Sequence, residues 1–324
     1  MTTPASSVLI LYSLPTDVQG AKLDEQIVEI ERDVGRIHDA IGRRAAYDSV
    51  QSLSDVAAVL DDYPEAKVVF NLVEEMPGGP DEVESVPMIC RAFGKKCTGN
   101  RHISRDKFLT NCVLKAHGIL APDAALAAKD FTVIEDIPDG KLIIKPTMGG
   151  GSEGITAANV IDDHDNRERN IRKVVAHIHA KDQDAILEEF IDGREITAGI
   201  IVRDGKPFVL PLLETKMLGE TEVQSYQAKW AEGSKEHQQT PTVCPADLPA
   251  PLADSIRQSA IEAWQACGCT SYCRIDFRAS HSSPYCIDVN DNPDLSVDGG
   301  IVEMLEKAGI KFETFIRDLV DQAQ

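Results

Sequence analysis

The stretch "CRIDFRASHSSPYCIDVNDNP", residues 273–293, constrains the fold more than any other part of the sequence. Two runs that alternate apolar and polar residues flank the polar turn "SHSS", a pattern typical of a β-hairpin. With the turn centred on these residues, Asp276 lies opposite Asp288 and Arg274 lies opposite Asn290. Their shared parity places all four side chains on one face of the sheet.

Two directly opposed carboxylates repel each other, so this hairpin predicts a cation between Asp276 and Asp288. Together with Asn290 they offer the hard oxygen ligands that Mg²⁺ binds, with water and substrate phosphates completing its shell. The alternative is a solvated acidic strand face, which leaves the presence of Arg274 on that face unexplained. The residues of opposite parity are predicted to be core, namely Ile275, Phe277, Ile287 and Val289.

Length and charge narrow the class of protein. A chain of 324 residues with 43% hydrophobic and 27% charged residues is typical of a soluble globular protein with several subdomains. The net charge of −20 argues against nucleic acid and acidic membranes as partners, because both need a basic surface. No apolar run could span a bilayer, and "MTTPASSVLILYS" lacks the basic region of a signal peptide. We therefore expect a cytoplasmic protein whose cysteines are reduced thiols.

The first hundred residues alternate between strand and helix patterns. Buried strands are predicted at "SVLILYSL" and "AKVVFNLVE", with a helix between them whose apolar stripe runs from Leu23 to Ile41. This order favours an open parallel α/β sheet. A further helix is predicted from a cap at Ser104 to His117, with Gly118 ending it.

The remaining pattern is a series of strands and helices around one long polar segment. "KLIIKPTMGGGSEGI" predicts two strands joined by glycines, followed by a helix at "DNRERNIRKVVAHIHA" and strands at "AILEEFI" and "REITAGIIV". Residues 215–244 are mostly polar, which favours a lid or binding loop. A helix near 251–267 precedes the hairpin, and two short helices close the chain.

Consecutive glycines in "KPTMGGGSEG" allow backbone N–H groups to approach an anion closely. Lys145, at the end of the preceding strand, is well placed to meet a phosphate, although the Walker pattern is absent. Taken alone, the loop is also compatible with a flexible turn beside a solvated lysine. Taken alone, Glu188 and Glu195 in "LEEFIDGRE" and Lys229 in "YQAKW" are compatible with surface groups.

The order of these motifs resembles the ATP-grasp superfamily and, more narrowly, the D-alanine–D-alanine ligase family. The resemblance rests on Lys145 with its glycines, "LEEFIDGRE", Lys229 and the hairpin, with "CTGNRHISRDKFLTNCVLKAHGILAPD" before them and "EMLEKAGIKFETFIRDLV" after them. It covers roughly residues 70–324. It implies an ATP-grasp fold with an N-terminal α/β domain (1–103) and two ATP-clamping subdomains (104–182 and 183–324).

The resemblance also implies roles for individual residues. Lys229 would reach the γ-phosphate and Arg274 the acyl-phosphate centre, while Asp276, Asp288 and Asn290 would hold Mg²⁺, for which Mn²⁺ is an alternative. The implied ATP-binding residues are Lys107, Lys145, Gly150, Gly151, Ser152, Glu188, Phe190, Ile191 and Glu195.

The departures from the family pattern concern the amino-acid half of the site. The first strand is followed by "YSLPTDVQGAKLDE", without the family's glycine-rich motif that contains serine and glutamate, and "FNLVEEMPGGPDEVE" replaces its "HG" element. Asp294 and Gly299 stand where the family expects a glycine and the serine that holds the second substrate's carboxylate. Asp288 replaces the usual glutamate. We therefore expect D-alanine to be a poor second substrate, and the accepted amine either to carry an extra positive charge or to lack the free carboxylate.

The resulting hypothesis is an ADP-forming ligase that works through an acyl phosphate. It would join an amino acid or small peptide-like acid to an amine, and the family resemblance adds the expectation of a homodimer. Two alternatives remain at this point: an authentic D-alanine–D-alanine ligase, and an ATP-binding regulatory protein without turnover. The complete set of Arg274 and metal ligands argues against the last.

Overall fold

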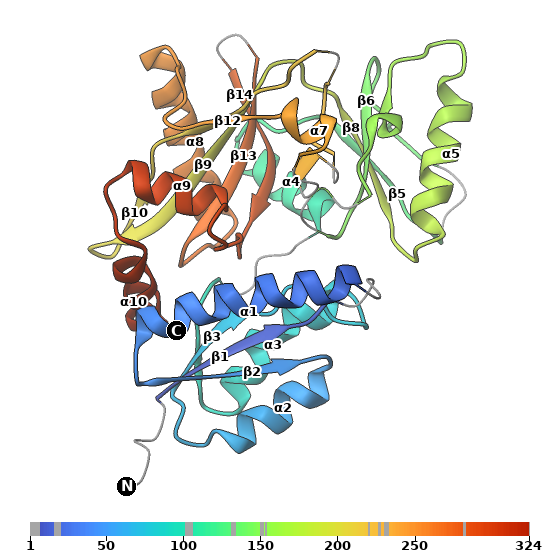
Figure 1. Ribbon diagram of the computed structural model, residues 1–324. Coiled ribbons are helices and arrows are strands. Elements are labelled where there is room, and N and C mark those ends of the chain that lie inside the picture. Colours follow the sequence, from blue (N-terminus) through green and yellow to red (C-terminus); the bar gives the residue numbers. More distant parts are fainter. Residues whose placement is uncertain are drawn as a thin grey trace, which may run out of the picture. The chain divides into compact units, whose positions relative to one another are not determined.

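The computed structural model shows two compact units, which are described separately (Figure 1). Unit 1 comprises Met1–His102, Thr270–Tyr272 and Asn292–Gln324, and unit 2 comprises Ile103–Cys269 and Cys273–Asp291. The predicted subdomain boundaries after residues 103 and 182 stay a prediction. The structure describes residues 7–15, 21–100, 106–130, 134–149, 152, 154–219, 221–225, 228–229, 233–280 and 283–323.

Unit 1 contains a four-stranded parallel sheet in the order β2-β1-β3-β4, which confirms the predicted open α/β architecture. Every residue of β1 is buried, as expected for a strand that helices cover on both faces. Leu9 and Leu11 contribute to the core formed with α2 and α3. The elements are β1 (Val8–Ser13), α1 (Ala21–Ile41), β2 (Ala45–Val50), α2 (Leu53–Asp62), β3 (Val68–Leu72), α3 (Pro80–Ala92) and β4 (Lys96–Cys97).

The two C-terminal helices, α9 (Gly300–Lys307) and α10 (Phe312–Gln322), were predicted and belong to unit 1. Helix α10 packs against α1, where Arg317 Nε donates a hydrogen bond to the carbonyl of Ala40 at 2.9 Å. The guanidinium of Arg36 lies 4.2 Å from the centre of the Phe312 ring. Among the described helices of the chain, none combines the length and hydrophobicity that a membrane crossing requires.

Unit 2 begins with α4 (Lys107–Ala116) and a four-stranded antiparallel sheet in the order β5-β8-β6-β7. The side chain of Asp106 caps α4, whereas the predicted cap, Ser104, lies outside the described residues. Gly118 follows the helix with a positive φ of 76°, which supports its predicted role as the stop. The sheet consists of β5 (Ala124–Ala127), β6 (Leu142–Pro146), β7 (Val160–Ile161) and β8 (Ala185–Glu189), and α5 (Arg167–His179) packs against it.

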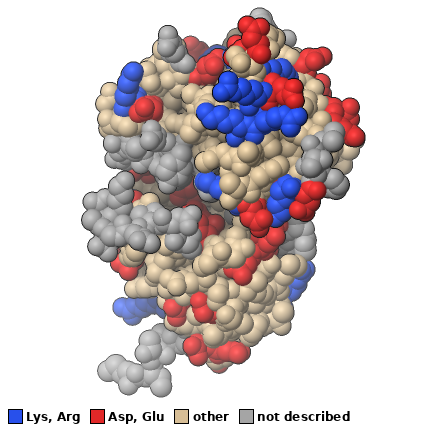
Figure 2. Space-filling model, turned by 90° about the vertical axis from the view of Figure 1, so that its right-hand side faces the viewer, with Lys and Arg blue, Asp and Glu red and all other residues tan. Residues whose placement is uncertain are grey.

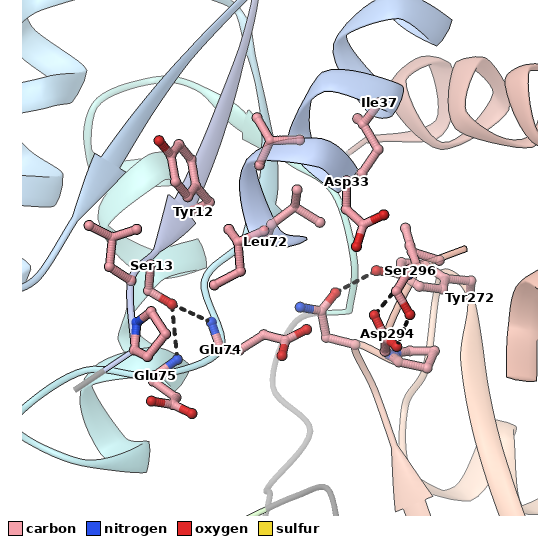
Figure 3. Close-up of a pocket in the computed structure, with 17 residues that line it drawn as sticks. Tyr12, Ser13, Asp33, Ile37, Leu72, Glu74, Glu75, Tyr272, Asp294 and Ser296 are labelled. Carbon is pink, nitrogen blue, oxygen red and sulfur yellow. Dashed lines mark hydrogen bonds between the residues drawn. The ribbon is translucent and has the colours of Figure 1, made fainter. Parts of the chain in front are cut away.

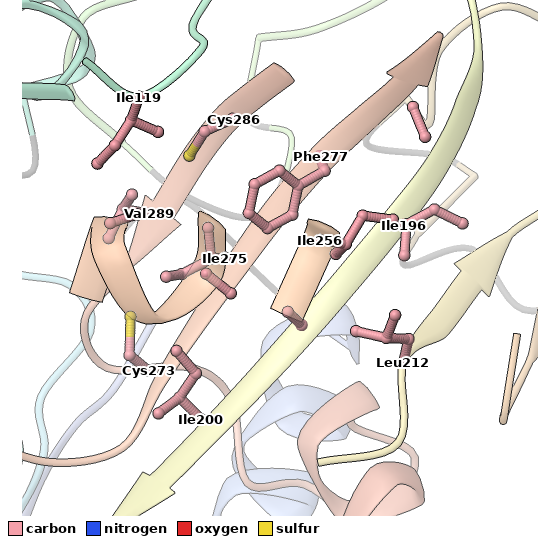
Figure 4. Close-up of a cluster of buried hydrophobic side chains, with 14 of the residues drawn as sticks. Ile119, Ile196, Ile200, Leu212, Ile256, Cys273, Ile275, Phe277, Cys286 and Val289 are labelled. Carbon is pink, nitrogen blue, oxygen red and sulfur yellow. The ribbon is translucent and has the colours of Figure 1, made fainter. Parts of the chain in front are cut away.

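The second sheet of unit 2 has six strands, with the path β12-β11-β9-β13-β14 and β10 paired to β9. Helix α8 (Ala250–Ala266) packs on it, so that Ile256 meets Ile275 and Phe277 in a buried apolar cluster (Figure 4). The strands are β9 (Arg194–Arg203), β10 (Lys206–Val209), β11 (Leu213–Thr215), β12 (Thr242–Val243), β13 (Cys273–Ser280) and β14 (Ser283–Asn290), and α7 (Lys235–Gln238) lies in the polar segment before β12.

The register of the β13–β14 hairpin is as predicted at its open end. Arg274 pairs with Asn290 and Asp276 pairs with Asp288. The register then shifts between Asp276 and Phe277, because a β-bulge inserts one extra residue, Ile287, into β14.

The bulge corrects the predicted core at one position. Phe277 pairs with Cys286, whose side chain is buried in the α8 cluster, whereas Ile287 is only half-buried. Strict alternation along β14 would have placed Ile287 there, and the inserted residue reverses the faces on the turn side of the bulge.

Basic side chains gather on one face of the molecule among acidic ones (Figure 2). On α5, Arg172 pairs with Glu168 at 2.7 Å, and both side chains are mostly exposed.

Phe277 provides a test of the unit 2 core. Its side chain is fully buried, so we expect Phe277→Ala to lower the free energy of unfolding by about 3–5 kcal/mol, through lost burial and the cavity left behind. Both tryptophans, at positions 230 and 264, belong to unit 2, so urea unfolding followed by tryptophan fluorescence reports on this unit. As a control, Phe208→Ala on β10, where the ring is 39% exposed, should cost less than about 1 kcal/mol. Equal losses for the two variants would contradict the assigned core.

Candidate functional site in unit 2

Lys145 on β6 and Glu188 on β8 form a buried ion pair. The ammonium Nζ lies 2.6 Å from Glu188 Oε2, with the side chains 10% and 3% exposed. Burial by itself would lower the pKa of Lys145, but Glu188 and more distant carboxylates outweigh it and raise that pKa. Glu188 Oε2 nevertheless lacks a hydrogen bond of regular geometry within the described structure. This buried ion pair therefore contains an oxygen, Glu188 Oε2, that can accept a further hydrogen bond.

Arg274 lies between the two opposed carboxylates of the hairpin. Its Nη2 is 2.9 Å from Asp276 Oδ2 and 4.0 Å from Asp288 Oδ2. Lys107, from the first turn of α4, places Nζ 3.6 Å from Asp288 Oδ1. Burial would raise the pKa of Asp288, but Lys107, Arg274, Lys145 and Lys229 together hold it below its usual value.

The donors around Asp276 hold its carboxylate in place. Thr197 on β9 donates from Oγ1 to Asp276 Oδ1 at 2.8 Å, and Arg274 Nε donates to Asp276 Oδ2 at 3.1 Å. Across the described part of the chain, no three His, Cys, Asp or Glu side chains converge as a metal site. A cation at the hairpin would therefore depend on Asp276, Asp288, the amide of Asn290 and ligand oxygens. That donor set fits Mg²⁺, which is usually bound by few protein oxygens.

Glu195 and Arg278 form a second buried ion pair, with Arg278 Nη2 2.9 Å from Glu195 Oε2. Burial raises the pKa of Glu195, and the nearby guanidinium of Arg278 opposes that rise. Arg278 also donates to the carbonyl of Glu222 at 2.7 Å, and its guanidinium lies 5.4 Å from the centre of the Phe190 ring. Phe190 and its neighbour Ile191 are themselves buried.

Arg278, Thr197 and Lys141 were not predicted from the sequence. Arg278 shares the parity of Arg274 and Asp276 along β13, so strand alternation could have identified it. Thr197 lies opposite Asp276 on β9, a pairing between strands far apart in sequence. Lys141, whose Nζ lies 4.3 Å from the Phe190 ring centre, gave no local signal.

The glycine-rich connection is described only in part, since Gly150 and Gly151 lie outside the described residues. Ser152 has a positive φ of 64°, and Lys107 Nζ donates to the carbonyl of Gly149 at 2.7 Å. Lys107 therefore contacts both this connection and Asp288. The charge of Lys229 also lowers the pKa of Asp288, although Lys229 is remote from it in sequence.

The two predicted substrate residues belong to unit 1. Asp294 lines a cavity of about 140 Å³ and accepts hydrogen bonds from the backbone N–H and hydroxyl of Ser296, at 2.8 and 2.5 Å (Figure 3). Gly299 instead precedes α9 and does not line this cavity. A Cβ atom at Gly299 would lie 3.0 Å from the carbonyl oxygen of Asp294, so a side chain fits poorly there. The hydroxyl in this region comes from Ser296.

Together, the N-terminal parallel sheet and the two antiparallel sheets of unit 2 define an ATP-grasp fold. The profile of the family described as "D-ala D-ala ligase C-terminus" matches residues 132–321, and the chain belongs to this family.

Similar proteins include D-alanine–D-alanine ligases, and a solved structure shares the fold. The chain is 27% identical over 218 residues to a D-alanine–D-alanine ligase of Syntrophotalea carbinolica, covering 67% of this chain and 66% of the relative. It is 29% identical to a D-alanine–D-alanine ligase of Maridesulfovibrio salexigens, covering 68% of each. The chain thus spans about two thirds of these relatives. The structure of the Bacillus anthracis D-alanine–D-alanine ligase complexed with ATP is similar in fold, with a TM-score of 0.72, 17% identity and coverage of 97% and 96%.

The Arg278–Glu195 pair provides a test of the site's electrostatics. We expect Arg278→Met to lower the free energy of unfolding by about 3–5 kcal/mol, because it leaves the buried carboxylate of Glu195 without its cation. Adding Glu195→Gln removes that charge and should restore part of the loss. Tryptophan fluorescence during urea unfolding measures both.

The matched control is Arg257→Met on α8, whose exposed pair with Asp254 should contribute at most about 1 kcal/mol. If Arg278→Met cost no more than Arg257→Met, or if Glu195→Gln gave no recovery, the pair would not be a buried charge pair of this kind.

Proposed function

We propose that this protein is an ATP-dependent, ADP-forming ligase that joins a carboxylate to an amine. The observation that carries the proposal is the set of cations gathered around one carboxylate. Lys107 Nζ and Arg274 Nη2 lie 3.6 and 4.0 Å from the carboxylate oxygens of Asp288. Lys145 and Lys229 also lower the pKa of Asp288, and the four cations come from four separate segments of unit 2. Such a concentration of cations beside oxygen ligands suits a polyphosphate bound with a divalent cation. The names of the relatives support the same class of reaction.

The proposed nucleotide site uses the residues that the family resemblance implied. Lys107 and Lys145 would neutralise phosphate charge, with Ser152 and the glycines of its loop donating backbone N–H groups. Glu188 Oε2, buried without a regular hydrogen bond, would accept from the amino group of adenine, and Phe190 and Ile191 would line the purine. Glu195 would accept from the ribose hydroxyls.

The proposed metal ligands are Asp276, Asp288 and Asn290. The cation, when bound, supplies charge neutralisation between phosphate oxygens. Since Thr197 and Arg274 already fix Asp276, the protein's own contribution is a carboxylate held in one orientation. The mobile partners in this arrangement would be Lys107 and Lys229, whose long side chains can redirect to phosphate oxygens.

In the proposed reaction the substrate carboxylate takes the terminal phosphoryl group and ADP leaves. The amine then attacks the acyl carbon, a tetrahedral oxyanion forms, and phosphate departs while the nitrogen loses a proton. Arg274 stays charged at any accessible pH, so it can donate hydrogen bonds to that oxyanion throughout. Holding the reactants together supplies much of the remaining rate enhancement.

A second candidate is an authentic D-alanine–D-alanine ligase, favoured by the names of the relatives. The two candidates share the nucleotide chemistry and differ in the amine and acid. Phosphate release, measured with a panel of paired amino acids and amines and followed by mass spectrometry of products, separates them. D-Alanyl-D-alanine as the best product would establish the second candidate. No phosphate release with any pair, together with no binding of an ATP analogue, would contradict both.

Asp288→Asn tests the proposed metal site. We expect turnover at low millimolar Mg²⁺ to fall by roughly two orders of magnitude, because the amide halves the anionic charge available to the cation. Thermal unfolding should remain cooperative, which separates loss of activity from loss of fold. Asp254→Asn, on the exposed surface of α8, is the matched control and should keep full activity. Near-normal turnover of Asp288→Asn would refute the metal assignment.

The segment 215–244 is proposed to close over bound nucleotide. Within it, Val223 is buried against Phe190, and the carbonyl of Glu222 accepts from Arg278, so its described residues contact the proposed purine site. We expect hydrogen exchange in peptides from this segment to slow when Mg²⁺ and a non-hydrolysable ATP analogue are added. Peptides from α2 in unit 1 serve as the internal reference. Unchanged exchange throughout 215–244, under conditions where the analogue binds, would count against closure.

A further inference from the structure

The cavity of unit 1 lies where open α/β sheets bind ligands. Ser13 ends β1 and Leu72 ends β3, and both line the cavity. These two parallel strands are neighbours in the order β2-β1-β3-β4, and the chain runs outward on opposite sides of them. The crevice outside the carboxyl ends of strands at such a switch point is the general ligand site of this architecture.

Several hydrogen-bond donors that line this cavity are already bonded to acceptors of the protein. The backbone N–H groups of Glu74 and Glu75 both donate to Ser13 Oγ at 3.1 Å. The N–H and hydroxyl of Ser296 both donate to Asp294, and the hydroxyl of Tyr272 donates to Asn292 at 2.6 Å. Figure 3 shows these bonds. A ligand carboxylate would therefore find few donors, and a carboxylate buried without them is strongly disfavoured.

Carboxylates, in contrast, are numerous around this cavity. Asp33, Glu74, Glu75 and Asp294 line the cavity, and no lysine, arginine or histidine stands among its described lining residues. Arg36 Nη1 and Arg32 Nε lie 3.4 and 3.8 Å from Asp33 Oδ1. The second oxygen, Oδ2, accepts no hydrogen bond from the described residues. Burial raises the pKa of Asp33, and the nearby Asp294 adds to that rise against the effect of Arg32. A cation between Asp33 and Asp294 would relieve this repulsion.

Ser13 supplies an independent sign of a ligand. Its side chain is 6% exposed and its oxygen already accepts two N–H groups. Nothing among the described residues accepts its proton, so the hydroxyl has one donor left for a ligand. In Figure 3 Ser13 lies on the opposite side of the drawn group from Asp33 and Asp294. The cavity thus offers the carboxylates of Asp33 and Asp294 on one side and the hydroxyl of Ser13, a neutral donor, on the other.

The apolar part of the cavity wall and the cavity's volume limit the chemistry and the size of the ligand further. Tyr12, Ile30, Val34, Ile37 and Leu72 supply apolar surface between the two polar ends. The volume of about 140 Å³ is close to that of an engineered cavity of about 150 Å³ that holds benzene, a molecule of six heavy atoms. A compound of alanine size fills such a space.

We propose that this cavity binds a small primary ammonium compound that carries a neutral hydrogen-bond acceptor in place of a carboxylate, such as an amino-acid amide. The ammonium group binds Asp33 and Asp294, the short alkyl part lies on the apolar wall, and the neutral acceptor receives the proton of Ser13. The binding step stands on unit 1 alone. Only the further statement that this compound is the amine joined in the reaction rests on the proposed function.

Alaninamide and alanine form a matched pair of probes, because they differ only in an amide or a carboxylate at one end. Isothermal titration calorimetry with the full-length protein, without nucleotide and for each enantiomer, measures the two affinities. We expect at least one alaninamide enantiomer to bind roughly tenfold or more tightly than the alanine of the same hand. Asp33→Asn and Asp294→Asn should each weaken alaninamide binding by a similar factor. Asp61→Asn, exposed on α2 outside the cavity, should leave it unchanged.

Equal or tighter binding of alanine would overturn the inference, as would unchanged affinity in both cavity variants. Absence of heat from either probe at its highest soluble concentration would overturn it as well. The comparison of the two probes uses the unmodified protein, so it does not depend on how well a variant folds. Binding of an ATP analogue, measured on the same preparation, distinguishes failure of this inference from failure of the proposed ligase function.

Discussion

The repulsion between Asp276 and Asp288 is the constraint on which the unit 2 site depends. Two carboxylates directly opposed on neighbouring strands destabilise a hairpin unless cations are shared between them. Arg274 and Lys107 supply these charges, and Lys107 comes from α4 rather than from the hairpin. Neutralising the carboxylates of this one strand pair therefore involves a lysine from a helix that is remote in sequence. It also gathers the positive charge that a polyphosphate would need.

Local patterns in the sequence were sufficient to predict the part of the site that lies within the β13–β14 hairpin. The pairing of Asp276 with Asp288 follows from the turn and from parity, and the structure confirms it. The same reasoning failed at Ile287, because a β-bulge leaves no signature in a run of apolar residues. Helices and strands with strong periodicity, such as α1 and β1, were equally predictable, whereas β2 and α2 carry weaker patterns and were not identified.

Pairs that depend on the order of strands were beyond sequence reasoning. Lys145 and Glu188 were both singled out, but their contact follows from β6 lying beside β8. Arg278 meets Glu195 because β13 lies beside β9, nearly eighty residues earlier in the chain. The cavity of unit 1 is a stronger example, since it joins the ends of β1 and β3 to residues after Pro293. Nothing local marks Ser13 and Asp294 as neighbours of one small space.

The β-bulge at Ile287 gives the two halves of β14 different tolerances to insertion and deletion. On the open side of the bulge, Asp288 and Asn290 share the site face, and on the turn side Cys286 faces the core. Removing Ile287 would leave every recorded cross-strand pair intact and restore simple alternation. Removing Val289 would instead turn Asn290 toward the core. Deleting one residue from this hairpin is therefore neutral for the site at Ile287 and disruptive at Val289, two residues away. Relatives whose hairpins differ in length can accordingly preserve the same chemistry.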